Sequence, residues 1–365
     1  MLSSTPKPLH TISGKTMLQW VIDANQSAGI KKSIIVAPQE FDKFDIENKN
    51  VIKAIQKKPL GTGDAVRKAT SLLDNFEGAV LICFADTPFI TPKTLKKIVN
   101  SLNNENDLVL TGFRKFNKNK YGKIIFDNNK KPCEIVEYKD KKRNEVDSIF
   151  CNGGIMGIHS SCLTHLNKIK KNSLSGEFYL TDIVKILSKE NKNISFIEID
   201  EEEIIGINTQ LDLSIAEGIS QNIIRNKAMM NGVKLIDPNS TFINYDTKFG
   251  KDVIIQPNVV FGNNVIIDSF VEIKSFSHIE ECRIKKGSII GPYARIRGGT
   301  IIDEKSKIGN FVEIKKSNIS NQVKINHLSY VGDTEIGSST NIGAGTITCN
   351  YDGKNKNKTK IGKNS

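Results

Sequence analysis

A six-residue repeat of isoleucine is the feature that most constrains the fold of this chain. In the C-terminal part, isoleucines recur at intervals of six residues, at Ile284, Ile290, Ile296, Ile302, Ile308 and Ile314. An α-helix repeats about every 3.6 residues and a plain strand every two, so neither explains this spacing. A parallel β-helix with three flat sides explains it, because one aliphatic residue per side points inward and each coil covers its neighbour. The competing explanation is a β-sandwich in which the spacing arose by chance.

The same spacing extends to both sides of this run. It joins Ile254, Val260 and Ile266, then Ile273 and Ile279, and later Ile319, Ile325 and Val331, then Ile336 and Ile342. The breaks between these groups are single steps of five or seven residues, and a glycine or a small polar residue often follows the aliphatic one. We therefore predict a triangular parallel β-helix from about residue 237 onward.

The first 200 residues follow a different pattern, in which segments of helical and strand periodicity alternate. We predict helices over 16–30, 64–75 and 93–102, the last with Thr91 as its N-cap and Pro92 as its first residue. We predict strands over 33–37, 78–84 and 107–111, with the apolar run 78–84 in the centre of a parallel sheet. This alternation predicts a doubly wound, mostly parallel α/β sheet that binds ligands at the carboxyl ends of its strands.

A long helix is predicted between the two halves. Over 210–230, Leu211, Ile215, Ile219 and Ile223 recur every four residues and form one apolar face, and Gly232 follows. We expect three parts: a nucleotide-binding domain over 1–208, a linker helix over 209–232 and a β-helix domain over 233–365.

Composition excludes several classes of protein. Apolar residues are 38% and charged residues 25% of the chain, and the longest strongly apolar run is Ala79–Ala85, so neither a disordered chain nor a membrane span is expected. The start of the chain has no secretory apolar segment, which favours the cytoplasm. The net charge of +12 reflects either solvated lysines or a preference for polyanionic small molecules as ligands. Acidic residues are interspersed among the basic ones, which argues against nucleic acid as the binding partner. The cysteines have no zinc-binding spacing and are expected to be reduced thiols: Cys83, Cys133, Cys151, Cys162, Cys282 and Cys349.

Several motifs carry residues suited to phosphate and acyl chemistry. The N-terminal half contains Lys7 in PKPLH, Gln56 followed by LGTG at 60–63, and Asp86 just after the apolar run. The C-terminal half contains GPYARIR at 291–297, GNFVEIKK at 309–316 and NHLSYVGD at 326–333. Taken singly, Lys7 would also suit an exposed solvated lysine, and Asp86 a helix cap or a turn. A lone histidine such as His327 is more often a structural residue.

Together and in this order, the motifs resemble the bacterial bifunctional N-acetylglucosamine-1-phosphate uridylyltransferase / glucosamine-1-phosphate N-acetyltransferase family over essentially the whole chain. The resemblance implies an α/β fold, with a Rossmann-like nucleotidyltransferase domain followed by a left-handed parallel β-helix of hexapeptide repeats. It also implies a cytoplasmic homotrimer that makes UDP-N-acetylglucosamine from sugar phosphates, with UTP and acetyl-CoA as substrates and Mg²⁺ as the metal. No nucleic acid and no membrane span are implied.

The resemblance assigns residues of the N-terminal half to the uridylyl-transfer site. Glycines at 61 and 63 would let the backbone approach the uracil base. The implied metal ligands are Asp86 and Asn208. The residues implied to bind UTP or UDP-N-acetylglucosamine are Lys7, Gln56, Gly61, Thr62, Gly122, Glu137, Asn152 and Asn208. Tyr179, Thr181 and Asp182 lie in a further matching segment and are expected to have mainly a structural role.

The resemblance also assigns residues of the β-helix to acetyl transfer. His327 would take the proton of the attacking amine, and Glu313 would orient or polarise that site. The residues implied to bind glucosamine 1-phosphate are Arg297, Lys315, Tyr330 and Asn341. Ala344, Asn350 and Tyr351 are implied to bind acetyl-CoA, with Asn350 and Tyr351 also in reach of the amino sugar and Lys356 near the acetyl donor.

The chain departs from the family pattern at four places. Ala85 and Gly298 stand where the family usually has glycine and proline. Met1 matches the end of the family's first strand and Gly-rich phosphate loop, and Ser365 lies inside its hexad region. The simplest account is a gene fragment cut at both ends, for which uridylyl transfer is expected to be severely impaired and acetyl transfer weakened.

Two other functions remain open from the sequence. One is a related sugar-1-phosphate nucleotidyltransferase whose β-helix is structural or acetylates another amino sugar. The other is a non-catalytic trimeric module that binds sugar nucleotides. His327, Lys315 and the Asn350-Tyr351 pair argue against the first.

Overall fold

The chain folds into two compact units. A computed structural model describes residues 1–43, 50–73, 75–103, 105–116, 119–138 and 148–365. One unit comprises residues 1–10 and 16–212, and the other comprises residues 11–15 and 213–365. Each has its own apolar core. In the described part of the chain, no helix combines the length and the apolar character needed to cross a membrane.

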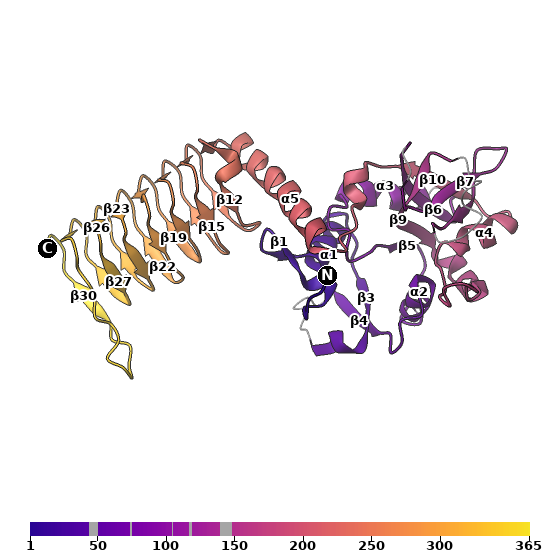
Figure 1. Cartoon of the computed structure of the whole chain (residues 1–365), viewed down its shortest axis with the longest axis horizontal. Coiled ribbons are helices and arrows are strands. Elements are labelled where there is room, and N and C mark those ends of the chain that lie inside the picture. Colours follow the sequence, from indigo (N-terminus) through magenta and orange to yellow (C-terminus); the bar gives the residue numbers. More distant parts are fainter. Residues whose placement is uncertain (44–49, 74, 104, 117–118, 139–147) are drawn as a thin grey trace. The chain divides into compact units, whose positions relative to one another are not determined.

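The first unit contains a mixed β-sheet and a separate parallel pair of strands (Figure 1). The strand order of the sheet is β10-β6-β9-β7-β8, and β5 also pairs with β9. These strands are β5 (Ala79–Ile82), β6 (Leu108–Arg114), β7 (Lys123–Phe126), β8 (Pro132–Val136), β9 (Phe150–His159) and β10 (Ile194–Glu198). The parallel pair consists of β3 (Ser33–Ala37) and β4 (Val51–Ile55).

The expected α/β class is confirmed, but the prediction of a mostly parallel sheet with 78–84 at its centre is wrong. Strand β5 runs antiparallel to β9, its one partner among the described strands, and its side chains are half-buried. The central strand is β9, which pairs with β5, β6 and β7, all antiparallel. An apolar run indicates that other elements cover both faces of a strand. Whether its partner strands run parallel or antiparallel depends on how the chain connects them, which the run does not show.

Three helices of the first unit overlap the predicted ranges, and the one that begins at Pro92 has its predicted cap at Thr91, whereas a fourth was not predicted. They are α1 (Met17–Ser27), α2 (Thr62–Thr70), α3 (Pro92–Asn103) and α4 (Asp182–Lys189). The Thr91 hydroxyl accepts a hydrogen bond from the Thr94 N–H at 3.2 Å, as predicted for an N-cap before Pro92. Short segments complete the unit: η1 (Lys7–Leu9), η2 (Gln39–Lys43), η4 (Ser160–Lys168) and η5 (Glu201–Ile204).

Helix α2 is shorter than the predicted helix 64–75. It ends at Thr70, Leu72 is 46% exposed, and Asp74 lies outside the described residues. The hydroxyls of Thr70 and Ser71 donate to the carbonyls of Arg67 and Lys68, both at 2.8 Å. Such side-chain bonds compete with the helical backbone pattern and favour termination.

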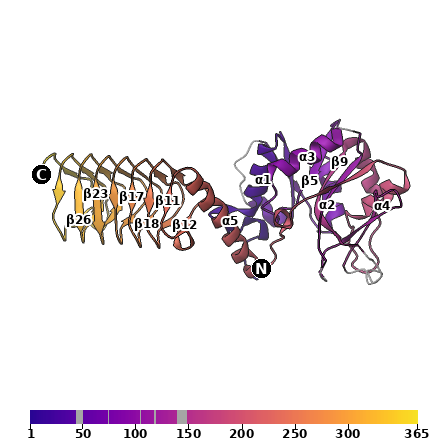
Figure 2. The ribbon, with the colours of Figure 1, turned by 90° about the horizontal axis from the view of Figure 1, so that it is seen from above.

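The second unit is a parallel β-helix with three faces, whose coils follow one another along one axis (Figure 2). The first face has β11 (Lys234–Leu235), β14 (Ile254–Ile255), β17 (Glu272–Ile273), β20 (Ile289–Ile290), β23 (Lys307–Asn310), β26 (Lys324–His327) and β29 (Asn341–Ile342). The second has β12 (Phe242–Ile243), β15 (Val260–Phe261), β18 (His278–Ile279), β21 (Arg295–Ile296), β24 (Glu313–Lys315) and β27 (Tyr330–Gly332). The third has β13 (Lys248–Phe249), β16 (Ile266–Ile267), β19 (Cys282–Ile284), β22 (Thr300–Ile302), β25 (Asn318–Ile319), β28 (Thr334–Ile336) and β30 (Thr359–Ile361). The short pieces β1 (Thr11–Ile12), β2 (Lys15–Thr16) and η6 (Pro238–Ser240) complete the element order.

The predicted six-residue period is confirmed. In the coils before Ile273, however, the prediction of which residues point inward is wrong by one position. The six isoleucines from Ile284 to Ile314 are at most 1% exposed. In the earlier coils, however, the predicted residues point outward and are 36–38% exposed: Ile254, Val260 and Ile266. Their neighbours Ile255, Phe261 and Ile267 are buried instead. Two apolar residues stand side by side at these positions, so spacing alone does not reveal which one the pleat turns inward.

Helix α5 (Gln210–Met230) has the predicted bounds but presents the opposite face to the protein. The predicted apolar face is largely exposed, with Leu211 at 71%, Ile215 at 52% and Ile223 at 55%. The buried residues are small or polar: Ala216, Ser220, Gln221, Arg225 and Ala228.

The polar face of α5 is buried because it covers the open edge of the first coil. Strand β12 is the first strand of its sheet, so its backbone has no neighbouring strand on one side. The Gln221 side chain takes that place: its Nε2 donates to the Ile243 carbonyl and its Oε1 accepts from the Ile243 N–H, both at 2.9 Å. The Arg225 Nε donates to the Thr241 carbonyl at 2.8 Å. Unpaired backbone groups at a buried edge are costly, and these side chains satisfy them.

We expect Gln221→Ala to destabilise the second unit. The change leaves two buried backbone groups of Ile243 without partners, at a cost of about 2–4 kcal/mol in the free energy of unfolding. Thermal unfolding followed by circular dichroism should show a fall of several degrees. The exposed neighbour Asn222 provides the control, because Asn222→Ala removes an amide from the same helix without uncovering the coil. Equal melting temperatures for the two variants would contradict this account of the cap.

Candidate functional site

A cavity of about 810 Å³ lies in the first unit, and the residues predicted to bind nucleotide gather around it. Its lining includes Gln56, Gly61, Thr62, Asp86, Gly122, Glu137 and Asn152. Tyr179 and Thr181, expected to be mainly structural, also line it. Gln56 directly follows β4, Glu137 directly follows β8, and Asp86 lies in the loop after β5. The cavity is therefore bordered by the carboxyl ends of strands, as expected for an α/β fold.

Lys7, Asp86 and Asn208 meet at one point. The ammonium of Lys7 contacts the Asp86 carboxylate and donates to the Asn208 side-chain oxygen at 2.7 Å. Two oxygen ligands from distant segments thus converge on a single cation. Carboxylate and amide oxygens are the ligands that Mg²⁺ prefers, and Mg²⁺ takes its remaining ligands from water and phosphate. The pair therefore fits such an ion, although the described residues contain no cluster of three or more acidic, histidine or cysteine ligands.

The start of α5 holds Asn208 in place. The Asp212 carboxylate accepts from the backbone N–H groups of Asn208 and Thr209 at 2.9 and 2.8 Å, and the Thr209 hydroxyl accepts from the Asp212 N–H at 3.1 Å. The hydrogen bond from the Asn208 N–H is the main cause that lowers the pKa of Asp212, against the opposing effect of burial. Thr209, not Asn208, is the side-chain cap of the helix, which leaves the Asn208 side chain to face Lys7.

Glu137 and its neighbours form a polar wall of the cavity. The Thr181 hydroxyl donates to the Glu137 carboxylate at 3.0 Å, and the Asn152 N–H donates to the Gly122 carbonyl at 2.8 Å. A Cβ atom on Gly122 would lie 3.3 Å from the Glu137 carboxylate, which shows how closely the two segments approach. Glycine at 122 thus leaves the carboxylate room beside the cavity.

The glycines at 61 and 63 allow the chain to pack closely against residues 177–181. Gly61 has φ +106°, and a Cβ atom there would lie 2.6 Å from the Phe178 carbonyl oxygen. The Gly63 N–H donates to that same oxygen at 2.8 Å, and the Thr62 hydroxyl accepts from the Leu180 N–H at 3.1 Å. These glycines therefore seat 177–181 against the start of α2. Gly61 also lines the cavity, and the expectation that the glycines admit the uracil base stays a prediction.

Cys83 lies just before Asp86 in sequence but is chemically inert. Burial raises the pKa of its thiol to about 12, against a smaller lowering by its hydrogen bond to Asn25. A thiol in this state is neither a nucleophile nor a metal ligand at neutral pH. All six cysteines are free thiols, as the sequence predicted.

On the second face of the β-helix, successive coils bring several predicted residues into register. Glu313 pairs with Tyr330, and Lys315 pairs with Gly332. The Arg297 Nη1 donates to the Glu313 carboxylate at 2.8 Å. This hydrogen bond raises the pKa of Arg297 and holds the guanidinium in a fixed place. Arg297 and Lys315 are two cations on one face, an arrangement suited to a phosphate group.

His327 has a partner that the sequence analysis did not name. Its Nδ1 lies 2.9 Å from the side-chain oxygen of Asn310, the residue in register on the previous coil. Among the described contacts, Glu313 bonds Arg297 rather than His327. Sequence reasoning missed Asn310, although it lies in the GNFVEIKK motif. An Asn oxygen at Nδ1 favours the tautomer that carries its proton there, which leaves Nε2 as the basic nitrogen.

The remaining predicted residues divide between two places. A Cβ atom on Gly332 would lie 2.6 Å from the Tyr330 hydroxyl and 2.9 Å from the Asn350 amide, so these two side chains meet above Gly332. Asn350 also donates to Asp333. Asn341 is not brought together with them: it lies on the first face, in a hollow of about 320 Å³ with Lys305 and Lys324. Ala344 is exposed and Tyr351 is 60% exposed.

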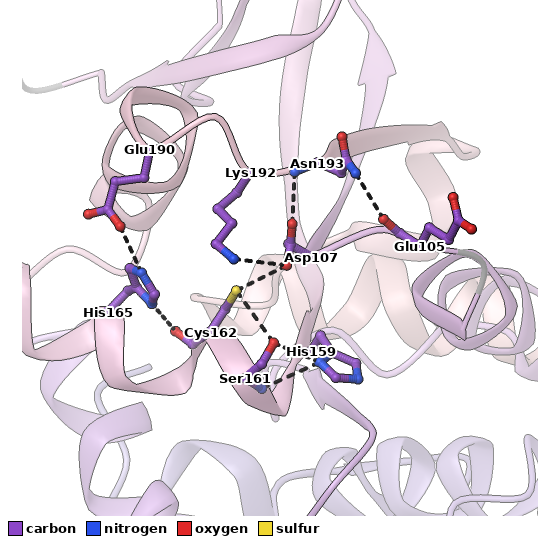
Figure 3. A network of polar contacts seen from close by, with 9 residues as sticks. All are labelled: Glu105, Asp107, His159, Ser161, Cys162, His165, Glu190, Lys192 and Asn193. Atoms are coloured by element: carbon purple, nitrogen blue, oxygen red, sulfur yellow. Dashed lines mark hydrogen bonds and ion pairs between the residues drawn. The ribbon is translucent and has the colours of Figure 1, made fainter.

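A second polar cluster lies at the start of β6 and is structural (Figure 3). The Asp107 carboxylate accepts from the Cys162 thiol at 3.3 Å and from the Asn193 N–H at 2.9 Å. His165 lies 2.9 Å from Glu190 and 3.2 Å from the Cys162 carbonyl oxygen. No described contact joins the imidazole to the thiol, and burial raises the pKa of Cys162. This cluster therefore lacks the thiol–imidazole pair that nucleophilic catalysis by a cysteine needs. Its hydrogen bonds connect η4 to the start of β6.

Comparison with known proteins identifies similar sequences for both units. Residues 1–171 match the family model of the MobA-like NTP transferase domain, and residues 281–316 match that of the bacterial transferase hexapeptide (six repeats). The bifunctional protein GlmU of Zymomonas mobilis is 40% identical over 99% of this chain and 82% of its own length. The bifunctional proteins GlmU of Bartonella bacilliformis and Paramagnetospirillum magneticum are 41% and 38% identical, each over 99% of this chain and 81% of their own length.

We expect Asp107→Asn to change how stability depends on pH. Partial burial alone would raise the pKa of Asp107, but hydrogen bonds from Asn193 and Cys162 and the charge of Lys192 outweigh it, so the pKa is lowered. The carboxylate therefore stabilises the fold above its unfolded pKa of about 3.9, and this contribution is lost as the pH falls through the folded value. Wild type should melt above the variant at neutral pH, and the gap should close as the pH falls below about 4.

The exposed Glu105 serves as the control for this measurement. Its substitution by glutamine removes a carboxylate near the same cluster without removing the bonds to Asn193 and Cys162. A gap between wild type and Asp107→Asn that stayed constant from pH 7 to pH 3 would contradict the assigned role.

Proposed function

Because the chain belongs to the family of the bifunctional protein GlmU, we propose that its two units carry the two reactions that end in UDP-N-acetylglucosamine. The β-helix unit transfers acetyl from acetyl-CoA to glucosamine 1-phosphate. The first unit then transfers uridylyl from UTP to N-acetylglucosamine 1-phosphate and releases pyrophosphate. The observation that best supports this proposal is the convergence of Lys7, Asp86 and Asn208 beside a polar cavity at strand ends.

In uridylyl transfer, a phosphate oxygen of N-acetylglucosamine 1-phosphate attacks the α-phosphorus of UTP, and pyrophosphate leaves with the electrons of the broken bond. Glu137 and Asn152 would orient the sugar, and Gln56 would contact the base. Lys7 would bring a positive charge to the phosphates, where negative charge develops. Mg²⁺ held by Asp86 and Asn208 would neutralise phosphate charge when bound.

In acetyl transfer, the amine of glucosamine 1-phosphate attacks the thioester carbonyl of acetyl-CoA, and coenzyme A leaves as the thiol. Arg297 and Lys315 would hold the phosphate of the sugar. His327 would take the amine proton at Nε2, with Asn310 accepting from Nδ1. Glu313 would act through Arg297, whose guanidinium it fixes, and Tyr330 and Asn350 would contact the substrates beside it.

We propose that the protein works as a homotrimer in the cytoplasm. Hexapeptide repeats are typical of oligomers, and Asn341 lies on a different face from Arg297 and Lys315. A neighbouring copy would bring an Asn341 to the face of another chain. We also propose three functional parts: a uridylyltransferase domain over 1–208, a linker helix over 209–232 and an acetyltransferase β-helix over 233–365.

We expect Asp86→Asn to weaken uridylyl transfer by about a hundredfold or more, because one charged oxygen that positions the metal and Lys7 is lost. Pyrophosphate release from UTP and N-acetylglucosamine 1-phosphate, measured against Mg²⁺ concentration, tests this. Asp200, an exposed acid of the same unit, gives the control Asp200→Asn. Unchanged rates in Asp86→Asn would remove this residue from the proposed site.

We expect His327→Ala to slow acetyl transfer by about 10²–10⁴-fold, the usual contribution of a general base. The measurement is thiol release from acetyl-CoA in the presence of glucosamine 1-phosphate, with the fold checked by circular dichroism. His278 is another exposed histidine of the β-helix, so His278→Ala should leave the rate unchanged. Absence of release by the wild type would sink the acetyltransferase assignment and leave a structural β-helix.

A further inference from the structure

Asp64 holds the amide of Gln56 at the edge of the cavity. Gln56 directly follows β4, is 7% exposed and lines the cavity. Asp64 lies in the first turn of α2. The Gln56 Nε2 donates to the Asp64 carboxylate at 2.6 Å, so a bond between side chains joins the end of a strand to the start of the next helix.

This bond removes an ambiguity that every free glutamine has. The oxygen and nitrogen of an amide exchange places by a half-turn, and the shape of the side chain does not change. A carboxylate has only acceptors, so it accepts the nitrogen and rejects the oxygen. Gln56 is therefore fixed in one orientation, and in the described part of the chain its side-chain oxygen has no protein hydrogen-bond donor.

The orientation of an amide decides which pyrimidine it matches. Uracil presents the N3–H donor beside the O4 acceptor, whereas cytosine presents the N3 acceptor beside the N4 amino donor. An amide that turns freely pairs with either edge, because it offers a donor and an acceptor in both orders. An amide locked in one order pairs with one base and opposes the other, and a mismatch of this kind costs about ten- to a hundredfold in affinity.

We propose that Asp64 is a positioning residue that sets base selectivity, because it locks Gln56 in the order that accepts uracil and opposes cytosine. The proposal rests on the proposed function, since it takes this cavity as the place where the base of UTP binds. Asp64 touches Gln56 and acts through it. A carboxylate in the first turn of a helix also interacts favourably with the helix dipole, so a merely structural role is the alternative that the test must separate.

The chain contains a matched pair that serves as a control. On α1, the Gln19 Nε2 donates to the Asp23 carboxylate, also at 2.6 Å. Neither residue lines the cavity. Asp23→Asn therefore makes the same change to the same kind of bond in the same unit, and base selectivity should not change.

The test measures equilibrium binding of UTP and of CTP, each with Mg²⁺, by titration calorimetry on the full chain. For wild type we expect tighter binding of UTP. For Asp64→Asn, whose amide bonds either end of Gln56, we expect the ratio of the CTP to the UTP dissociation constant to fall about tenfold or more, largely because CTP binds more tightly. Gain of CTP binding is a change that a mere loss of structure does not produce.

Two further variants keep the result decisive. Asp64→Ser, whose hydroxyl both donates and accepts, replaces Asp64→Asn if that variant does not fold, and it should lose selectivity in the same way. Asp64→Glu keeps a group that only accepts and should retain the preference for UTP. If Asp64→Asn, or Asp64→Ser in its place, keeps the preference for UTP, this inference is wrong, and the proposed function is unaffected. A wild type that binds neither nucleotide, or both equally, would overturn the nucleotide assignment of the proposed function and this inference with it.

Discussion

The β-helix depends on the pairing of each coil with the next, because a single coil has no core of its own. Its inward side chains, such as Ile290 and Ile308, are covered by the coils on either side, and backbone hydrogen bonds join every third strand. At the first coil this pairing must end. Helix α5 ends it with Gln221, which bonds both backbone groups of Ile243 as a neighbouring strand would. The need to satisfy that edge explains why the helix buries its polar side and exposes Ile215 and Ile223.

Both candidate sites hold a cation, which we propose binds phosphate, beside a carboxylate. Lys7 contacts Asp86 in the first unit, and Arg297 contacts Glu313 in the second. In each case the acid fixes the position of the cation before any substrate arrives, which reduces the reorganisation that binding requires. The acid also competes with the phosphate for the cation. Selective binding then depends on a ligand that offers more contacts than the resident carboxylate does.

The sequence was sufficient to predict features that repeat or that lie at strand ends. The hexad period, the bounds of α5 and the Thr91 cap follow from local pattern. The resemblance to a known family, rather than local pattern, predicted that Gln56, Asp86 and Glu137 belong to one site. The antiparallel pairing of β5 with β9 depends on distant segments, so the apolar run 78–84 could not reveal it. Asp64 and Asn310 were missed for a related reason. Each acts on a partner through one hydrogen bond, and a single polar residue in a motif does not show which neighbour it will meet.

The stacked coils also limit how this part of the gene can change in length. Arg295, Glu313 and Tyr330 occupy one column because each stands one full coil after the last, and neighbouring strands are about 4.8 Å apart. Removal of a single hexad would turn every later residue onto the next face and take Tyr330 out of the column. Removal of a whole coil would shorten the β-helix and leave each later residue on its own face. Viable insertions and deletions should therefore come in steps of one whole coil. The length of the β-helix can then change in evolution only by multiples of one coil.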